Sequence, residues 1–263
     1  YKIYWEDTKM EFSATAGTAG GSLKALFEVR DGDNLENFKG KVTKADSYSL
    51  TVENTSIDNI KSLNLPDKDG KITVNNISYS YDSWEAQVDA QGNIKSVTFN
   101  LSKDKAIADP EKTVAEGYLL NAGSAINARG IPYYMTQLNE FVRNFSEMFN
   151  QIESKGQNLN GDTPPTFFEA ITNTAKVYDF SESEAYSKLP DGQTATINSS
   201  SNTYYRMTAA NFSVNKDVMN DVSLFATSTD YVKTDSCDIV DELKKLQSEK
   251  TVSVSYTHLT LPT

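Results

Sequence analysis

The stretch from 130 to 156 constrains the fold of this chain more than any other part of its sequence. Seven large side chains in it recur at intervals of three and four positions, the heptad spacing of a helix that packs along one seam. They are Ile131, Tyr134, Leu138, Phe141, Phe145, Met148 and Ile152. Pro132 fits the first turn of such a helix, and Gly156 after Lys155 fits its end. The pattern predicts one helix about 36 Å long.

A second stripe widens the apolar face of this predicted helix, and a wide face is typical of a bundle of several helices. It consists of Met135, Val142 and Phe149. Each buried Phe or Leu contributes about 1.5–3 kcal/mol, but only when other side chains cover it. The chain itself offers two shorter predicted helices, at 23–30 and 239–246. We therefore expect the seam to be buried against other helices, some of them from flanking sequence. A core helix of an ordinary α+β domain is the alternative.

Between about 42 and 104, apolar residues alternate with polar ones, which is the period of a β-strand. The predicted strands are 48–52, 70–81, 84–88 and 94–101. Gly92 and Asn93 suit the tight turn of a hairpin between the last two strands. Two sets of side chains should each share one face: Trp84, Ala86 and Val88, and Val97, Phe99 and Leu101. This region therefore predicts a small antiparallel β unit.

These patterns together predict an α+β protein. Its main part would be a helical rod or bundle domain with a long amphipathic helix, interrupted by a small antiparallel β-rich inserted domain. The predicted parts are the start of the helical domain at 1–31, the insert with short helices at 32–130, the long helix at 131–160 and a mixed α/β remainder at 161–252. Asp109 before Pro110 predicts one of the short helices, over 109–123. We interpret 253–263 as a non-native tail.

Charge and composition exclude several classes of function. The formal net charge is 25 − 36 = −11, which disfavours binding to nucleic-acid phosphates and to anionic lipids. No window reaches the roughly 18 apolar residues that a membrane-spanning helix needs, and the first ten residues do not resemble a signal peptide. The chain has one cysteine, Cys237, so it cannot form an internal disulfide.

The sequence predicts no catalytic residue, no cofactor and no metal site, so we expect a protein that is not an enzyme. His258 is the one histidine and lies in the tail, which leaves no Ser-His-Asp or Cys-His arrangement. Glu182 with Glu184, or Glu28 with Asp31, could act as paired carboxylates in hydrolysis, but solvated surface charge is the simpler explanation. The segment "DKDG" begins like a calcium loop and lacks the closing glutamate, so we predict a β-turn.

Four blocks of the sequence, in this order, resemble the family of flagellar hook-associated protein 1, the first hook-filament junction protein of bacterial flagella. They are "GGSLKALFEVRD" (20–31), "IPYYMTQLNEFVRNFSEMFNQIESKG" (131–156), "FF" (167–168) and "YYRMTAANFSVNKDVMNDVSLFATS" (204–228). In that family the pair equivalent to Arg30 and Asp31 runs almost directly into the "IP" helix. Here residues 32–130 intervene, which is why we interpret them as an insert.

The resemblance implies a structural component of the bacterial flagellum that joins hook to filament through subunit assembly. Its implied partners are copies of itself in a ring, the hook protein and the second hook-filament junction protein, with no nucleic acid and no membrane. The implied location is extracellular, after export by the flagellar type III system without a cleaved signal peptide. The family also has N- and C-terminal assembly helices, and because neither is visible here we interpret the chain as an internal fragment.

A function of a different class is an extracellular binding module whose β-rich insert recognises carbohydrate or a host surface. Tyr79, Tyr81 and Trp84 carry this alternative, because aromatic rings can stack on sugar rings. Tyr79 and Tyr81 point to the same face of a regular strand. Packing of that face into the core of the β unit is the simpler interpretation.

Overall fold

The structure is a computed structural model of the chain. It describes residues 6–9, 19–67, 69–103, 106–110, 114, 116–232 and 236–247, the side chain of Glu184 excepted, so the predicted tail at 253–263 lies outside the described residues. The chain divides into two compact units. The first comprises Tyr1–Ser56, Asn64–Ser83 and Thr98–Thr136, and the second comprises Ile57–Leu63, Trp84–Val97 and Gln137–Thr263.

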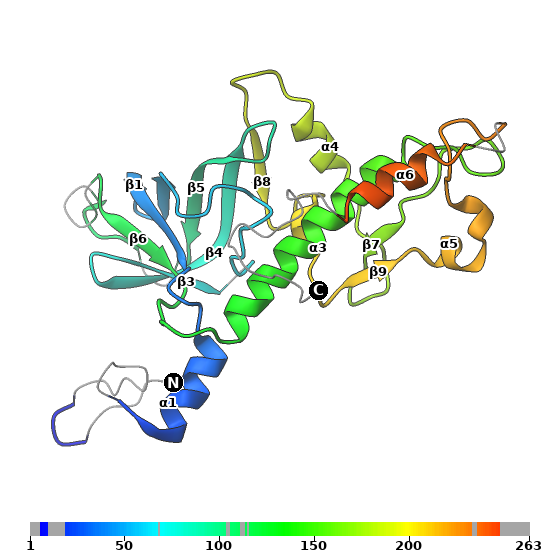
Figure 1. Cartoon of the computed structure of the whole chain (residues 1–263). Coiled ribbons are helices and arrows are strands. Elements are labelled where there is room, and N and C mark those ends of the chain that lie inside the picture. Colours follow the sequence, from blue (N-terminus) through cyan, green and yellow to red (C-terminus); the bar gives the residue numbers. More distant parts are fainter. Residues whose placement is uncertain are drawn as a thin grey trace. The chain divides into compact units, whose positions relative to one another are not determined.

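Most strands of the described residues belong to one sheet, in the order β3-β6-β1-β2-β5-β4-β8. Because β3 also pairs with β4, the first six strands of this order close into an antiparallel barrel, to which β8 adds on β4 (Figure 1). The bounds are β1 Phe38–Asp46, β2 Ser49–Glu53, β3 Gly70–Val74, β4 Ile77–Val88, β5 Ile94–Leu101, β6 Leu119–Ala122 and β8 Ala195–Asn198. Closure gives each of the six barrel strands a partner on both sides, whereas β8 ends the strand order and pairs with β4.

Alternation along the strands places the apolar side chains inside the barrel. The two predicted sets, Trp84, Ala86 and Val88 and then Val97, Phe99 and Leu101, are all buried, as expected. In the first unit, Phe99 contacts the rings of Phe38 and Tyr81, with centroids 5.7 and 5.1 Å away. The buried hydroxyl of Tyr81 donates a hydrogen bond to the carbonyl oxygen of Pro66 at 3.1 Å. These aromatic contacts make the barrel a packed core.

The predicted fold class, a helical rod or bundle interrupted by a small β unit, is wrong. The main body is the six-stranded antiparallel barrel, and no helical bundle or coiled coil forms among the described residues. The short helix predicted over 109–123 is also wrong at its end, since 119–122 is strand β6. Strand β6 pairs with β1 on one side and with β3 on the other. Such pairing joins residues about 50 to 80 positions apart, which local periodicity does not reveal.

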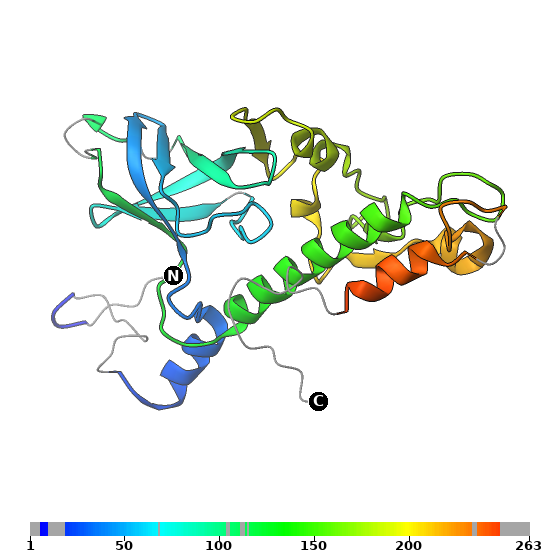
Figure 2. The ribbon, with the colours of Figure 1, turned by 45° about the horizontal axis from the view of Figure 1, so that its top comes forward.

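Among the described residues, one helix is long and the others are short. Helix α3 spans Ile131–Glu153, within the range predicted from the seam spacing, while α1 and α6 lie where the two shorter helices were predicted. The other bounds are α1 Gly21–Asp31, α4 Ser181–Ser187, α5 Lys216–Asn220 and α6 Asp238–Lys245, with 3-10 turns η1 Tyr204–Arg206 and η2 Val222–Leu224. A two-stranded sheet pairs β7 (Phe168–Ala170) with β9 (Phe212–Val214). In the second unit, α6 lies beside the end of α3 in both views (Figure 1, Figure 2), and Lys155 pairs with Glu242 at 3.1 Å.

The segment 32–130 begins and ends at one point of the first unit. The N–H of Gly130 donates to the carbonyl oxygen of Gly32 at 3.0 Å, and Asp33 and Arg129 form an antiparallel bridge. A Cβ atom on Gly130 would lie 2.3 Å from the carbonyl oxygen of Glu28. The two backbones therefore approach too closely for any side chain at this position. The two ends of the segment 32–130 thus lie side by side, as the ends of an inserted segment must. The sheet is not formed by this segment alone, however, because strand β8 comes from residues after 130.

Candidate functional site

Helix α3 is inverted: its polar side is buried and much of its apolar side is exposed. The buried residues are Gln137, Asn139, Glu140, Arg143, Ser146, Glu147, Asn150 and Glu153. A surface helix of a globular protein normally shows the opposite, with an apolar stripe toward the core and polar residues toward water. The two faces of α3 are therefore the features of this chain that need a functional explanation.

Arg143 is the centre of the buried polar face. Only 2% of the residue is exposed, and its guanidinium donates three hydrogen bonds to backbone carbonyl oxygens. Nε reaches Met207 at 2.9 Å, and Nη1 reaches Lys61 at 2.8 Å and Leu63 at 2.7 Å. The guanidinium carbon also lies 4.5 Å from the centroid of the Tyr205 ring. A buried cation is tolerated only with such hydrogen bonds, so Arg143 holds two loops of the second unit onto the helix.

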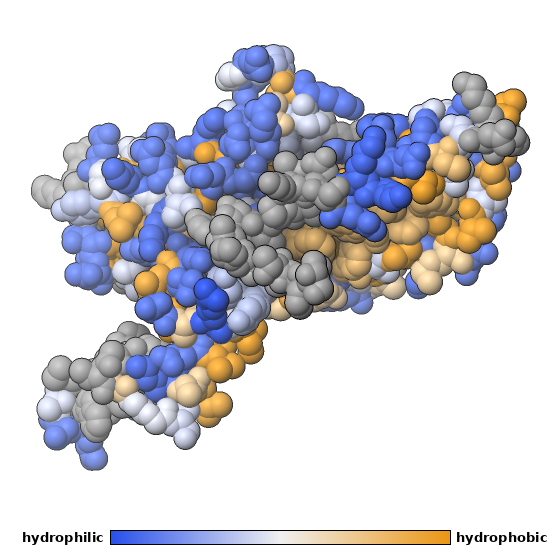
Figure 3. All heavy atoms as spheres, in the orientation of Figure 1, coloured by the Kyte–Doolittle hydropathy of each residue, from blue (hydrophilic) through white to orange (hydrophobic). Residues whose placement is uncertain are grey.

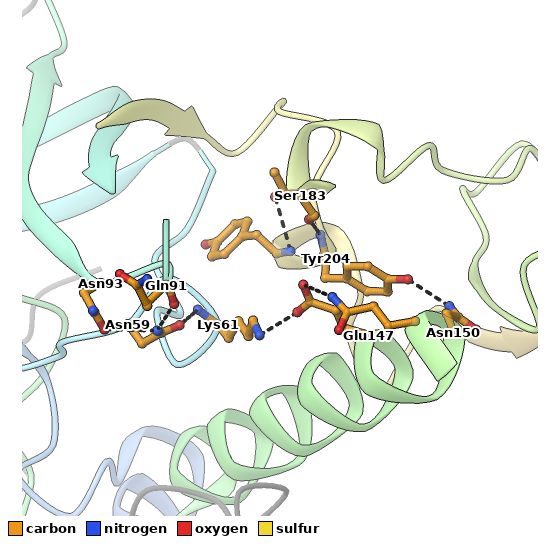
Figure 4. Close-up of polar contacts among 11 residues, drawn as sticks. Asn59, Lys61, Gln91, Asn93, Glu147, Asn150, Ser183 and Tyr204 are labelled. Atoms are coloured by element: carbon orange, nitrogen blue, oxygen red, sulfur yellow. Dashed lines mark hydrogen bonds and ion pairs between the residues drawn. The ribbon is translucent and has the colours of Figure 1, made fainter. Parts of the chain in front are cut away.

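One turn further along α3, an ion pair also holds the loop that contains Lys61. Nζ of Lys61 lies 2.6 Å from Oε2 of Glu147, whose side chain is 6% exposed (Figure 4). In the same loop, the amide of Asn59 donates to the carbonyl oxygen of Gln91 at 3.0 Å. The N–H of Lys61 donates to Oδ1 of Asn59 at 3.1 Å. The loop 57–63 is thus fixed by side chains from α3 and by the hairpin at 89–93.

Asn150 binds the backbone of strand β7 as a neighbouring strand would. Its Nδ2 donates to the carbonyl oxygen of Phe168, and its Oδ1 accepts from the N–H of Phe168, both at 2.9 Å. Nδ2 also contacts the Tyr204 hydroxyl at 2.9 Å, and the hydroxyl of Ser183 accepts from the N–H of Tyr204 (Figure 4). An amide is the one side chain that offers both a donor and an acceptor in this geometry.

Glu153 ends the buried face with a carboxyl group that is only partly satisfied. The residue is 1% exposed, and its Oε1 accepts from the N–H of Ala226 at 2.7 Å. Among the described residues no donor lies on Oε2. Burial raises the pKa of the Glu153 carboxyl to about 7, against the smaller opposing effect of the Ala226 hydrogen bond. This carboxyl therefore titrates near neutral pH.

The predicted seam lies on the opposite side of the helix and is largely uncovered. Ile131, Tyr134, Leu138 and Phe141 are exposed by 56, 55, 48 and 42%. Phe145, Met148 and Ile152 are half-buried. The Phe145 ring lies 5.7 Å from Phe141 and 5.4 Å from Phe168, at the border of a small core that contains Phe168, Ala170, Tyr204 and Met207.

Helices of the described residues therefore leave Ile131, Tyr134, Leu138 and Phe141 exposed, and burial of the seam against helices from flanking sequence stays a prediction. The apolar side chains of α1 are also uncovered: Leu23, Leu26 and Val29 are exposed by 52, 66 and 55%. In the second unit, which contains α3 from Gln137 onward, apolar side chains gather over this helix and the neighbouring sheet of β7 and β9 (Figure 3). This apolar surface is the candidate site, and we call the side of α3 formed by the seven predicted residues the seam.

The predicted aromatic platform for sugars is not present. Tyr79, Tyr81 and Trp84 are exposed by 4, 0 and 1%, so all three rings are core residues. Trp84 packs edge-on against Tyr205, with centroids 5.0 Å apart. A buried ring cannot stack on a ligand, and the alternative function loses the residues on which it depended.

The structure also places the groups considered for catalysis. Asp31 receives two hydrogen bonds from the exposed Arg30 and forms an ion pair with it. Oε2 of Glu182 accepts from the N–H of Asn202 at 3.1 Å. In the part of the chain that the structure describes, no three His, Cys, Asp or Glu side chains converge as a metal site would require. Within the same residues, no helix has the length and apolar character that crossing a membrane demands.

Comparison of the chain with protein-family models, with curated proteins and with solved structures found no significant match. The sequence blocks and the two faces of α3 are therefore the observations from which a function is inferred.

Proposed function

We propose that this chain is part of a structural subunit of the bacterial flagellum, of the hook-associated protein 1 family, which joins hook to filament by assembly and catalyses no reaction. One observation from the sequence and one from the structure support the proposal. Four sequence blocks resemble that family in order, and the block with the longest regular pattern, 131–156, contains the exposed seam. The uncovered seam is the single structural observation that carries the proposal.

The argument from the seam is energetic. The polar face of α3 is already used within the chain, so the helix cannot turn its apolar side inward without breaking the Arg143 and Asn150 contacts. Leu138 and Phe141 each keep more than two fifths of their surface in contact with water. Covering such half-exposed side chains gains about 1 kcal/mol each. Helices that supply this cover would come, by the resemblance, from flanking segments of the same protein and from neighbouring subunits.

The partners follow from the same resemblance: copies of the protein in a ring, the hook protein and the second hook-filament junction protein, at an extracellular location reached through the flagellar type III system. The acidic surface, with a net charge of −11, does not favour nucleic acid or anionic membrane as a partner. Paired apolar seams with polar rims are typical of such permanent assemblies.

Deletion of the gene in its own bacterium tests the function. We expect hooks without attached filaments and a loss of swimming, restored by the wild-type gene on a plasmid. Normal filaments in the deletion strain would refute the proposal. A motility defect with filaments still attached to hooks would refute the junction role.

A seam variant then tests the mechanism. The double substitution Leu138→Ser and Phe141→Ser should fail to restore filament attachment, because it removes apolar surface that assembly covers. The matched control is Val222→Ser, since Val222 is 80% exposed but lies outside the seam. Circular dichroism of the purified chains should show that both variants fold. Full restoration by the seam variant would exclude the seam as an assembly surface.

A further inference from the structure

The first unit carries a hollow on the outer surface of the barrel that assembly through the seam does not use. It has a volume of about 320 Å³ and is lined by Thr73, Asn75, Asn76, Tyr118, Leu119 and Asn121. Pockets that hold small molecules have volumes of about 300–1,000 Å³, so this hollow is at the small end of that range. Its lining comes from the β3–β4 turn and from the β6 region, which are more than 40 positions apart in the sequence.

One wall is a hairpin turn of two asparagines. Asn75 and Asn76 join Val74 to Ile77, which pair directly, and both have positive φ angles of 49 and 61°. A two-residue turn of this kind matches the twist of the strands, and asparagine tolerates positive φ better than most residues. The turn is therefore a short and well-defined one that places two amide side chains at the rim of the hollow.

The floor is built by strand register. Thr73 on β3 pairs with Asn121 on β6, and the next pair, Val74 and Leu120, is buried in the barrel at 1 and 0% exposure. Because side chains alternate along a strand, Thr73 and Asn121 point outward, side by side. Tyr118 and Leu119 precede Asn121 on the same segment and remain exposed by 40 and 52%. The hollow thus combines three amides, the exposed Tyr118 and Leu119, and the Thr73 hydroxyl, which shares a hydrogen bond of 3.1 Å with the hydroxyl of Ser78.

We propose that this hollow binds a neutral saccharide. The amides of Asn76 and Asn121 offer paired donors and acceptors that match vicinal hydroxyl groups, and an exposed tyrosine ring offers an apolar surface for the C–H face of a sugar. The lining contains no carboxylate, ammonium or guanidinium group, so it does not select an ion. Lysines border the hollow on β1, where Lys39 pairs with Asn121 and Lys41 with Leu119, but neither belongs to the lining.

This proposal goes beyond the assembly function and uses residues of the first unit alone. It is also distinct from the sugar platform predicted from the sequence, whose three aromatic rings are buried. Neither Tyr118 nor Asn121 was singled out by the sequence patterns, because both lie in the segment where a helix was predicted. Only the pairing of β6 with β3 brings them to the asparagine turn.

A titration of the full ¹⁵N-labelled chain with mannose, galactose, N-acetylglucosamine and glucuronic acid tests the proposal. We expect at least one neutral sugar to shift the amide signals of residues around 73–76 and 118–121, with a dissociation constant of about 1 mM. No shift with any neutral sugar would overturn the proposal. Shifts with glucuronic acid alone, abolished by salt, would also overturn it and would point to the bordering lysines.

Two variants and one control make the assignment specific. Tyr118→Ala and Asn121→Ala should each weaken binding at least tenfold, while the spectra outside the hollow stay unchanged. Tyr48→Ala is the matched control, because Tyr48 is an exposed tyrosine of the same unit (48%) outside the hollow. Unchanged binding by both hollow variants would overturn the site. Filament attachment by these variants should be normal. A loss of sugar binding can therefore be told apart from a failure of the assembly function.

Discussion

Nε of Arg143 donates a hydrogen bond to the carbonyl oxygen of Met207 at 2.9 Å, and both residues are buried, at 2 and 0% exposure. This contact joins the middle of α3 to the loop after η1, 64 positions later in the chain. With the bonds from Nη1 to Lys61 and Leu63, it makes one cationic side chain the link between three separate segments of the second unit. The polar face of α3 is thus a structural core in its own right.

Replacement of Arg143 should destabilise the protein strongly. Arg143→Met keeps the stem of the side chain but leaves two buried carbonyl oxygens and the partly buried one of Lys61 without their donor, and we expect a loss of about 3–5 kcal/mol in the free energy of unfolding. Arg143→Lys should lose less, because it keeps the charge but not the planar set of donors. Urea denaturation measures both. Arg30→Lys, at an exposed ion pair, is the control and should change stability by less than about 0.5 kcal/mol. Equal effects at the two positions would contradict this role of Arg143.

Asn150 should be needed for the docking of β7. Asn150→Ala removes the donor and the acceptor that the backbone of Phe168 uses, so we expect a loss of about 2–3 kcal/mol. Hydrogen exchange should show the fastest gain at the Phe168 amide, whose N–H bonds to Oδ1 of Asn150. Asn144→Ala, on the same helix, is the matched control. Unchanged protection of the Phe168 amide in the Asn150 variant would show that Asn150 does not hold β7 in place.

Glu153 should make stability fall as pH rises toward neutral. The folded-state pKa is raised from 4.5 to about 7, so between these values the folded protein keeps a proton that the unfolded chain has lost. Stability from this group is therefore full below about pH 4.5 and is lost progressively up to about pH 7, by about 3 kcal/mol. Glu153→Gln should remove that part of the pH dependence in urea denaturation at low and at neutral pH. Glu242→Gln, at an exposed ion pair, should leave it intact, and identical profiles for all three proteins would contradict the assignment.

Gly130 should tolerate no side chain. A Cβ atom there would lie 2.3 and 2.6 Å from the carbonyl oxygens of Glu28 and Val29, which are backbone atoms at the end of α1. We expect Gly130→Ala to cost about 1–3 kcal/mol by forcing the two backbones apart, visible as a lower melting temperature. Gly20→Ala is the control, since no atom lies within 4 Å of its added Cβ and its φ is −149°. Comparable melting temperatures for the two variants would show that the backbone at Gly130 can move away from the end of α1 without cost.

Sequence patterns alone located several elements, because helices and hairpins are specified by neighbours along the chain. The spacing from Ile131 to Ile152 placed α3, and the alternation in 84–101 placed the hairpin of β4 and β5 with the correct buried faces. The sequence patterns did not predict the barrel, because strand β6 is four residues long and its residues do not alternate strongly between apolar and polar. Its state depends on the pairing with β1 and β3, which no local pattern encodes.

The sequence by itself determined which side chains of α3 share a face, since a helix turns once every 3.6 residues whatever surrounds it. Only the tertiary structure decided which of those faces is covered. Three carbonyl oxygens gather around Arg143 and a strand backbone docks on Asn150, so the polar face is buried and the seam from Ile131 to Phe141 is left exposed. Burial depends on contacts between distant segments, and for this helix hydrogen bonds rather than apolar area set its orientation.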